Sequence, residues 1–75
     1  MLIVDQARGN VYDAQLFREF NIREIDLHFY AIVAVPVDPN VPDAALGEYD
    51  TIDEAKDALQ SLALAWETAK CYFMT

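Results

Sequence analysis

The side chains best suited to acid–base, nucleophilic or metal chemistry are the only histidine, His28, and the only cysteine, Cys71. No sequence neighbour completes an acid–base pair or a metal site with His28, and its place in the strand pattern points outward. We therefore expect His28 to face solvent or a partner, where its titration near neutral pH would tune an interface. Cys71 has no CxxC companion, has only Lys70 as a basic neighbour and lies in an apolar run, so we expect a buried, unreactive thiol.

Acidic residues are numerous enough to suggest metal sites, but their spacing does not support one. Asp38, Asn40 and Asp43 resemble part of a calcium loop, yet the glycine expected at the sixth position is Asp43 and the terminal glutamate would fall on Tyr49. A second series has the spacing of a helix start, where capping and solvation explain the carboxylates without a cation: Asp50, Asp53 and Asp57. The sequence predicts no metal and no cofactor.

Motifs of common enzyme classes do not occur in the chain. The two glycines, Gly9 and Gly47, form no phosphate-binding loop, and there is no Gly-x-Ser-x-Gly motif. A chain of 75 residues makes one small domain, residues 1–75, that buries only about 60% of its unfolded surface. That size leaves little room for a substrate cleft, so we expect a protein that is not an enzyme.

The charge and hydropathy of the chain exclude further classes. Thirteen acidic residues against five basic ones give a net charge of −8, which argues against direct binding to nucleic acid or to an anionic membrane. No apolar stretch reaches the roughly 18 residues of a membrane span, and Met1 to Val4 is followed at once by Asp5, without the basic and apolar regions of a signal peptide. With one cysteine, these features favour a cytoplasmic location.

The clearest predicted element is a helix from Thr51 to Lys70. Thr51 and Glu54 form a capping-box pattern, in which the threonine side chain accepts the Glu54 amide and the glutamate reaches back to the Thr51 amide. Leu64 lies on the polar face, either as a solvated leucine or as a partner contact. The remaining apolar residues share an arc roughly 160° wide, which must be covered: Ile52, Ala55, Ala58, Leu59, Leu62, Ala63, Ala65, Trp66 and Ala69.

Alternation of apolar and polar residues predicts the strands. Residues 2–4 and 11–12 are expected to form a hairpin, residues 13–20 are irregular, and residues 22–27 and 29–37 form two strands or one long bent strand. A loop over residues 38–43, a strand over 45–49 and a final strand over 71–74 complete the chain. Because side chains alternate between the two faces of a strand, we expect one set of alternate residues to face the core: Ile25, Leu27, Phe29, Ala31, Val33, Val35 and Val37.

These elements predict an α+β fold, a small antiparallel β-meander of about five to six short strands with one C-terminal amphipathic helix packed on one face. An apolar content of 55% is high for this length and indicates either a dense core or an apolar face completed by another copy of the chain.

Several short segments resemble a family of very short uncharacterised proteins of Gram-positive bacteria and their prophages. The resemblance lies in residues 1–6, 30–34, 46–51, 54–56 with 59, and 72–74. It implies a small antiparallel sheet with a C-terminal helix. It implies no activity and supplies no site residues.

Two hypotheses of function follow. The first is a non-enzymatic binding or scaffold module that self-associates through a sheet edge or an uncovered apolar surface. Its candidate interface residues are His28, Tyr30, Leu64 and Tyr72. The alternative is an acidic decoy or inhibitor, of the kind prophages encode, that occupies a basic surface of a nucleic-acid-handling protein.

Overall fold

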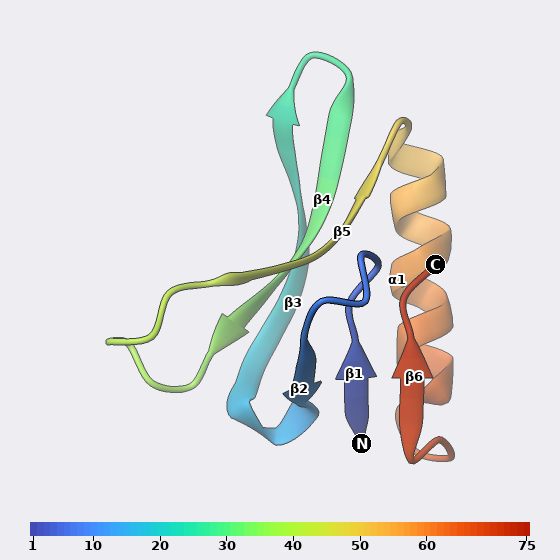
Figure 1. Ribbon diagram of the computed structural model, residues 1–75. Coiled ribbons are helices and arrows are strands. Elements are labelled where there is room, and N and C mark those ends of the chain that lie inside the picture. The colour runs from blue at the N-terminus through green and yellow to red at the C-terminus, as the bar shows by residue number, and fades with distance from the viewer.

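The computed structural model describes residues 1–75 and contains six strands and one α-helix, as the α+β prediction requires. The strands divide between two three-stranded sheets, of order β2-β1-β6 and β3-β4-β5. Figure 1 shows α1 alongside both sheets and the loop after β4 extending away from the rest of the chain. The elements are β1 (Leu2–Val4), β2 (Val11–Asp13), the 3-10 helix η1 (Ala14–Leu16), β3 (Phe17–Asp26), β4 (Phe29–Pro36), β5 (Ala44–Tyr49), α1 (Ile52–Ala65) and β6 (Cys71–Phe73).

The antiparallel meander is formed by β3, β4 and β5. The smaller sheet departs from it, since β1 pairs antiparallel with β2 but parallel with β6. Both ends of the chain therefore meet in one sheet. Gln6 joins this sheet to β5: its amide donates to the Leu46 carbonyl at 2.8 Å, and its side-chain oxygen accepts the Glu48 amide at 2.8 Å.

Helix α1 begins at the predicted cap. Thr51 has extended backbone angles and its hydroxyl oxygen accepts the Glu54 amide at 3.1 Å, although the Glu54 carboxylate accepts from the Thr51 hydroxyl rather than from its amide. The helix ends at Ala65, five residues before the predicted Lys70, and the next residues form turns. This early end lets the chain reverse, so that the Lys70 carbonyl accepts the Leu2 amide at 2.9 Å and β6 joins β1.

The prediction of which residues on β4 face the core is wrong. Ile32 and Ala34 belong to the main buried cluster beneath α1, whereas Ala31 and Val33 are buried on the opposite face of the sheet. The other members of the predicted core set include four that are exposed, Ile25, Leu27, Phe29 and Val37. The reason is that β4 is the central strand of its sheet and its residues are buried on both faces, so its apolar run does not reveal which face meets the helix.

The segment predicted to be irregular contains a short helix and the start of β3. The Asp13 side chain caps η1 by accepting the Gln15 amide at 3.0 Å, and β3 begins at Phe17. The register of β3 against β4 shifts between Phe17 and Glu19, which leaves Arg18 as the extra residue of a bulge. The bulge restores Phe17 and Phe20 to the same face, and it explains why neither a helical period nor a strand period fitted this sequence.

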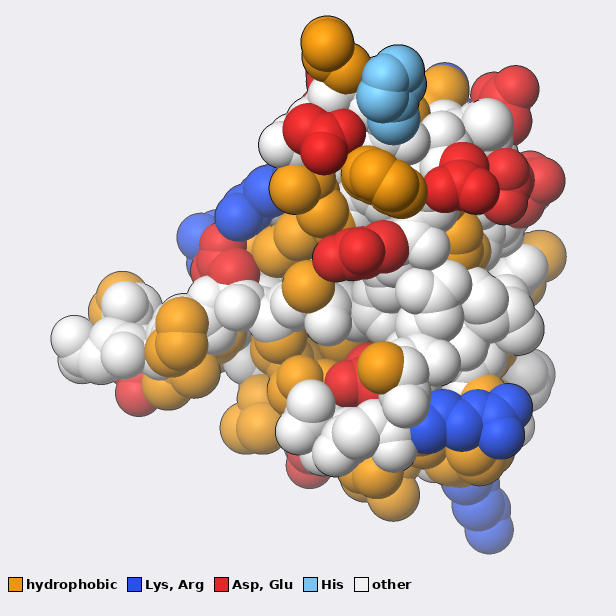
Figure 2. All heavy atoms as spheres, turned by 45° about the horizontal axis from the view of Figure 1, so that its top comes forward, with side chains coloured by type: hydrophobic (Ala, Val, Ile, Leu, Met, Phe, Trp, Pro, Cys, Tyr) orange, Lys and Arg blue, Asp and Glu red, His pale blue; other side chains and the backbone are white.

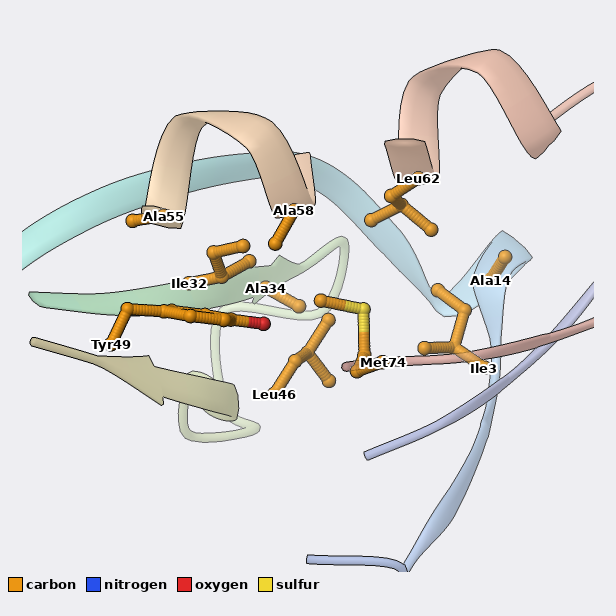
Figure 3. Close-up of a cluster of buried hydrophobic side chains, with 10 residues drawn as sticks. All are labelled: Ile3, Ala14, Ile32, Ala34, Leu46, Tyr49, Ala55, Ala58, Leu62 and Met74. Carbon is orange, nitrogen blue, oxygen red and sulfur yellow. The ribbon is translucent and has the colours of Figure 1, made fainter. Parts of the chain in front are cut away.

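The main core lies between α1 and the two sheets (Figure 3). Its largest fully buried side chains are Ile3, Ile32, Leu46 and Leu62. Figure 3 shows α1 directing small alanines and Leu62 toward these sheet residues, which is the close approach that the alanine-rich face predicts. The ten members of the cluster are Ile3, Ala14, Ile32, Ala34, Leu46, Tyr49, Ala55, Ala58, Leu62 and Met74.

Candidate interaction surface

The four predicted interface residues do not lie on one surface. His28 is exposed in the two-residue turn between β3 and β4, and Leu64 is 75% exposed on α1. Tyr30 and Tyr72 are half-buried and pack against the core cluster. His28 and Leu64 therefore have free surfaces, whereas the tyrosines contribute mainly to packing.

Leu64 borders a groove of about 720 Å³ between β3 and the C-terminal half of α1. Trp66, 40% exposed just after the end of α1, lines the same groove. The walls are mostly apolar, with few charges: Arg18, Glu19, Phe20, Leu59, Leu62, Ala63, Leu64, Trp66, Glu67 and Thr68. The predicted apolar face of the helix is thus only partly covered, because Ile52, Ala63 and Trp66 remain exposed.

A row of aromatic rings begins in this groove and leads away from it. Phe20 meets Trp66 edge-on at 5.3 Å between ring centroids, Phe17 meets Phe20 at 5.6 Å, and Tyr12 meets Phe17 at 5.7 Å. Such edge-to-face pairs hold the rings in fixed orientations. The row connects α1 to β3 and β2, and only the bulge at Arg18 allows two of its rings to be neighbours on one strand.

A second hollow, of about 530 Å³, opens at the other end of the aromatic row. The exposed residues Leu16, Val37 and Val41 border it, with Tyr12 and Phe17 on its inner side. The loop after β4 forms one wall, and its Val37 amide donates to the Leu16 carbonyl at 2.8 Å. Both apolar hollows therefore depend on the same aromatic row.

Acidic side chains gather at the end of the molecule that holds the β3–β4 turn and the start of α1. Figure 2 looks toward this end and shows them around the single histidine. A hollow of about 420 Å³ between β5 and α1 is lined by four acids and no basic residue: Glu48, Asp50, Glu54 and Asp57. Across the chain, no three His, Cys, Asp or Glu side chains come together in a way that would hold a metal ion.

Tyr49 is a buried polar group that the sequence did not single out. Its hydroxyl has no hydrogen-bond partner, and burial together with the nearby Tyr72 raises the pKa of the Tyr49 phenol above its ordinary value. The ring lies over Gly47, where an added Cβ would be 2.8 Å from the hydroxyl oxygen. The sequence did contain a signal for this arrangement, a glycine two residues before a tyrosine in a predicted strand. Such residues lie on the same face, and the missing side chain of the glycine leaves room for the ring.

Asp5 is the other missed polar residue. It is buried at the end of β1, where its carboxylate accepts the Gly9 amide at 3.0 Å and the Asn10 side chain at 3.1 Å. Burial acts to raise the pKa of Asp5, but hydrogen bonds from Asn10, Gly9 and Arg8 outweigh it and hold the pKa below its ordinary value. Arg8 has a positive φ of 58° in the same turn, so we assign Asp5 to the stability of the turn rather than to a site.

Cys71 is exposed, not buried as predicted. It lies on β6, an edge strand of the smaller sheet, and its apolar neighbours in sequence alternate between the faces of that sheet. The apolar run was therefore a poor guide to burial.

Comparisons of the chain with protein-family models, with curated proteins and with solved structures give no match. The resemblance to the short Gram-positive and prophage proteins accordingly stays a prediction. The one α-helix, of 14 residues, is not long and apolar enough to cross a membrane.

Proposed function

We propose that the protein is a non-enzymatic interaction module of the cytoplasm that self-associates through the groove beside α1. The observation that carries the proposal is the pair Leu64 and Trp66, two large apolar side chains exposed on the rim of one groove. Exposed apolar side chains that gather around a concave surface mark interaction sites more often than scattered ones do.

The charges on this surface are compatible with binding a second copy of the chain. The groove carries Arg18, Glu19 and Glu67, so its charges nearly cancel, while acidic residues concentrate around the start of α1. Two molecules that each carry a charge of −8 repel least when their acidic ends point away from each other. The C-terminal half of α1 satisfies that condition.

A stable dimer of this small chain would use a substantial part of its surface. A stable interface buries roughly 800 Å² on each partner, which is about one sixth of the 5059 Å² of accessible surface of this chain. The groove and the adjoining edge of β3 are the surfaces that such an interface would use.

Sedimentation velocity over a wide range of concentrations tests self-association directly. We expect a monomer–dimer equilibrium for the wild type and a shift toward monomer for Leu64→Lys, because the lysine would bring a charge into the apolar groove. Leu27→Lys is the matched control, since Leu27 is also an exposed leucine but lies in the β3–β4 turn. A wild-type protein that stays monomeric at millimolar concentration would contradict the proposal.

The acidic hollow between β5 and α1 supports a second candidate function, that of a decoy for a basic surface. Its carboxylates have no basic residue among the lining side chains, so they are free to meet lysine or arginine from a partner. We expect the protein to bind a lysine-rich peptide at low salt and to lose it as ionic strength rises. Asp57→Asn combined with Glu54→Gln should weaken that binding, whereas Asp13→Asn, away from the hollow, should not. Equal binding by both variants would contradict this candidate.

A further inference from the structure

The outer edge of β3 is the longest unpaired strand edge in the molecule. β3 spans ten residues and lies at the end of the sheet order β3-β4-β5. None of the loop or turn hydrogen bonds involves the backbone of residues 17–26. Register shifts against β4 occur between Phe17 and Glu19 and again between Glu24 and Asp26, so the regular part of the edge runs from Glu19 to Glu24.

This edge has a self-complementary sequence. Two segments with the same pattern, apolar–Arg–Glu–apolar, flank Asn21: residues 17–20 and residues 22–25. When two such strands run antiparallel with Asn21 opposite Asn21, every arginine meets a glutamate and every apolar residue meets an apolar one. Within the regular part of the edge the facing pairs are Phe20 with Ile22 and Glu19 with Arg23. Counting on into the two register shifts, Arg18 meets Glu24 and Phe17 meets Ile25.

We propose that two copies of the chain dimerise by antiparallel pairing of their β3 edges, centred on Asn21, to form one continuous six-stranded sheet. The proposal rests on the self-association proposed above and specifies its geometry. Opposite charges and apolar side chains that face each other across antiparallel strands stabilise the pair, and the exposed backbone groups of both edges become hydrogen-bonded.

The charges select this register over its neighbours. Shifting one strand by a single residue places Glu19 opposite Glu24 in one direction and Arg18 opposite Arg23 in the other. Like charges directly opposite destabilise a strand pair, and a one-residue slip also moves the apolar residues to the wrong face. The register centred on Asn21 avoids both penalties and keeps both α1 helices on the same side of the joined sheet.

Asn21 supplies an independent observation. Its side-chain oxygen is buried and has no hydrogen-bond partner, while its side-chain nitrogen donates to the Glu19 carboxylate at 2.6 Å. A buried acceptor without a donor is costly. In the proposed dimer the two Asn21 side chains are direct neighbours, and a rotation that turns the buried oxygen toward the edge lets the amide nitrogen of the other copy donate to it.

The groove beside α1 belongs to the same interface. Phe20 lies on the helix side of β3, since it faces Ala34 of the core, and it lines the groove together with Trp66. A second β3 strand would bring its own Ile22 next to Phe20, on this side of the sheet. Apolar side chains of the second copy would then approach Leu64 and Trp66.

A charge-exchange experiment tests the register. In Glu19→Arg, arginine would face arginine in the homodimer, and in Arg23→Glu, glutamate would face glutamate. We expect each variant alone to dimerise about ten-fold more weakly than the wild type, or worse. An equimolar mixture restores both ion pairs in a heterodimer, which native mass spectrometry resolves from the homodimers. A loss of folding cannot imitate this recovery on mixing.

Arg23 also pairs with Asp43 within the chain, so the exchange is repeated with Arg18→Glu and Glu24→Arg, which leave that ion pair intact. The mixture of these two variants should recover in the same way. Failure of both mixtures to form heterodimers, with a wild type that dimerises, would overturn the proposed register.

Disulfide trapping tests the centre of the interface. In a Cys71→Ser background, Asn21→Cys places two thiols opposite each other, where facing Cα atoms lie about 4.5–5.5 Å apart and a disulfide can form. We expect rapid cross-linking under mild oxidation. Glu24→Cys is the control, because residue 24 faces residue 18 and not itself. Equal cross-linking of both variants would contradict the pairing.

The outcomes separate the two proposals. A wild-type protein that never associates contradicts self-association and the β3 pairing together. A dimer that is weakened by Leu64→Lys, yet shows neither heterodimer recovery nor Asn21→Cys cross-linking, contradicts only the β3 pairing.

Discussion

The two faces of the larger sheet are covered in different ways, although β4 is buried on both. On one face Ile32 and Ala34 lie in the main core beneath α1. On the other, open face Ala31 and Val33 are only 2% and 7% exposed, although the one α-helix packs on the opposite side of the sheet. Their neighbours across the strands are mostly polar, Asn21, Arg23 and Glu48, and the fourth is the small residue Ala45.

The difference shows that burial alone does not measure a residue's contribution to stability. On the open face, a long side chain such as that of Arg23, which is paired with Ala31, can lay its aliphatic stem over a short apolar residue and keep its charge in water. Such a cover adjusts easily when a methyl group is lost. The packed face beneath α1 cannot adjust as easily, so a cavity there remains.

The largest expected contrast comes from truncating one residue on each face. Leu62→Ala should lower the free energy of unfolding by about 2–5 kcal/mol, because it leaves a cavity between α1 and the sheets. Val33→Ala should cost about 1 kcal/mol, since its neighbours across the strands, Asn21 and Ala45, have no helix packed over them and can move inward. Urea unfolding at one fixed protein concentration measures both. Equal losses would contradict the contrast between the faces.

A smaller loss of stability is expected from adding a methyl group to Gly47 of β5, which lies on the packed face. Gly47→Ala places a Cβ 2.8 Å from the Tyr49 hydroxyl oxygen, so the ring must move within the core. We expect a loss of about 1–3 kcal/mol in thermal or urea unfolding. Gly9→Ala is the control, because nothing lies within 4 Å of its added Cβ. A stable Gly47→Ala protein would show that Tyr49 is not tightly held.

Removing the unpaired hydroxyl should be neutral or favourable. Tyr49→Phe keeps the ring and deletes a buried group that has no partner, so we expect its stability to equal or exceed that of the wild type by up to about 1 kcal/mol.

Because the pKa of Tyr49 is raised, the effect of this substitution on stability depends on pH. The unfolded chain ionises at the ordinary pKa near 10, while the folded protein keeps the proton to higher pH. Wild-type stability is therefore complete below that pH and falls as pH rises toward the folded pKa. Tyr49→Phe should remove this part of the alkaline loss, which circular dichroism measures between pH 8 and about 11. An identical alkaline profile would show that another group is responsible.

The smallest effect is expected for the ion pair on the open face. Arg23 pairs with Asp43 across this surface, and the arginine side chain is about half exposed. An exposed pair contributes at most about 1 kcal/mol. Arg23→Gln should therefore change monomer stability little and keep part of the stem that covers the face. A loss as large as that of Leu62→Ala would mean that the open face is as rigid as the packed one.

Much of the fold was predictable because local chemistry determined it. The cap at Thr51, the turn after β1 and the loop of prolines before β5 depend on residues close in sequence. Where the prediction failed, distant contacts decided. The helix ends at Ala65 because residues 71–73 pair with β1, and no feature of residues 66–70 reveals that pairing.

The candidate surface was only partly predictable. Leu64 was visible as an apolar residue on a polar helix face. Trp66 was assigned to the buried arc, and its partial exposure follows from the early end of α1. The groove and the aromatic row could not be foreseen, since they require the bulge at Arg18 and the register of β3 against β4.

The amino-acid sequence by itself determined the acidic charge, the helix start, the positions of most strands and the self-complementary pattern around Asn21, since each depends on residue type and short spacing. Only the tertiary structure decided which face of β4 meets α1, which termini pair and that β3 is an edge strand. Those choices depend on contacts between residues far apart along the chain, whose competing alternatives differ little in local energy. The pattern around Asn21 suggests a dimer only because the sheet order places β3 at an open edge.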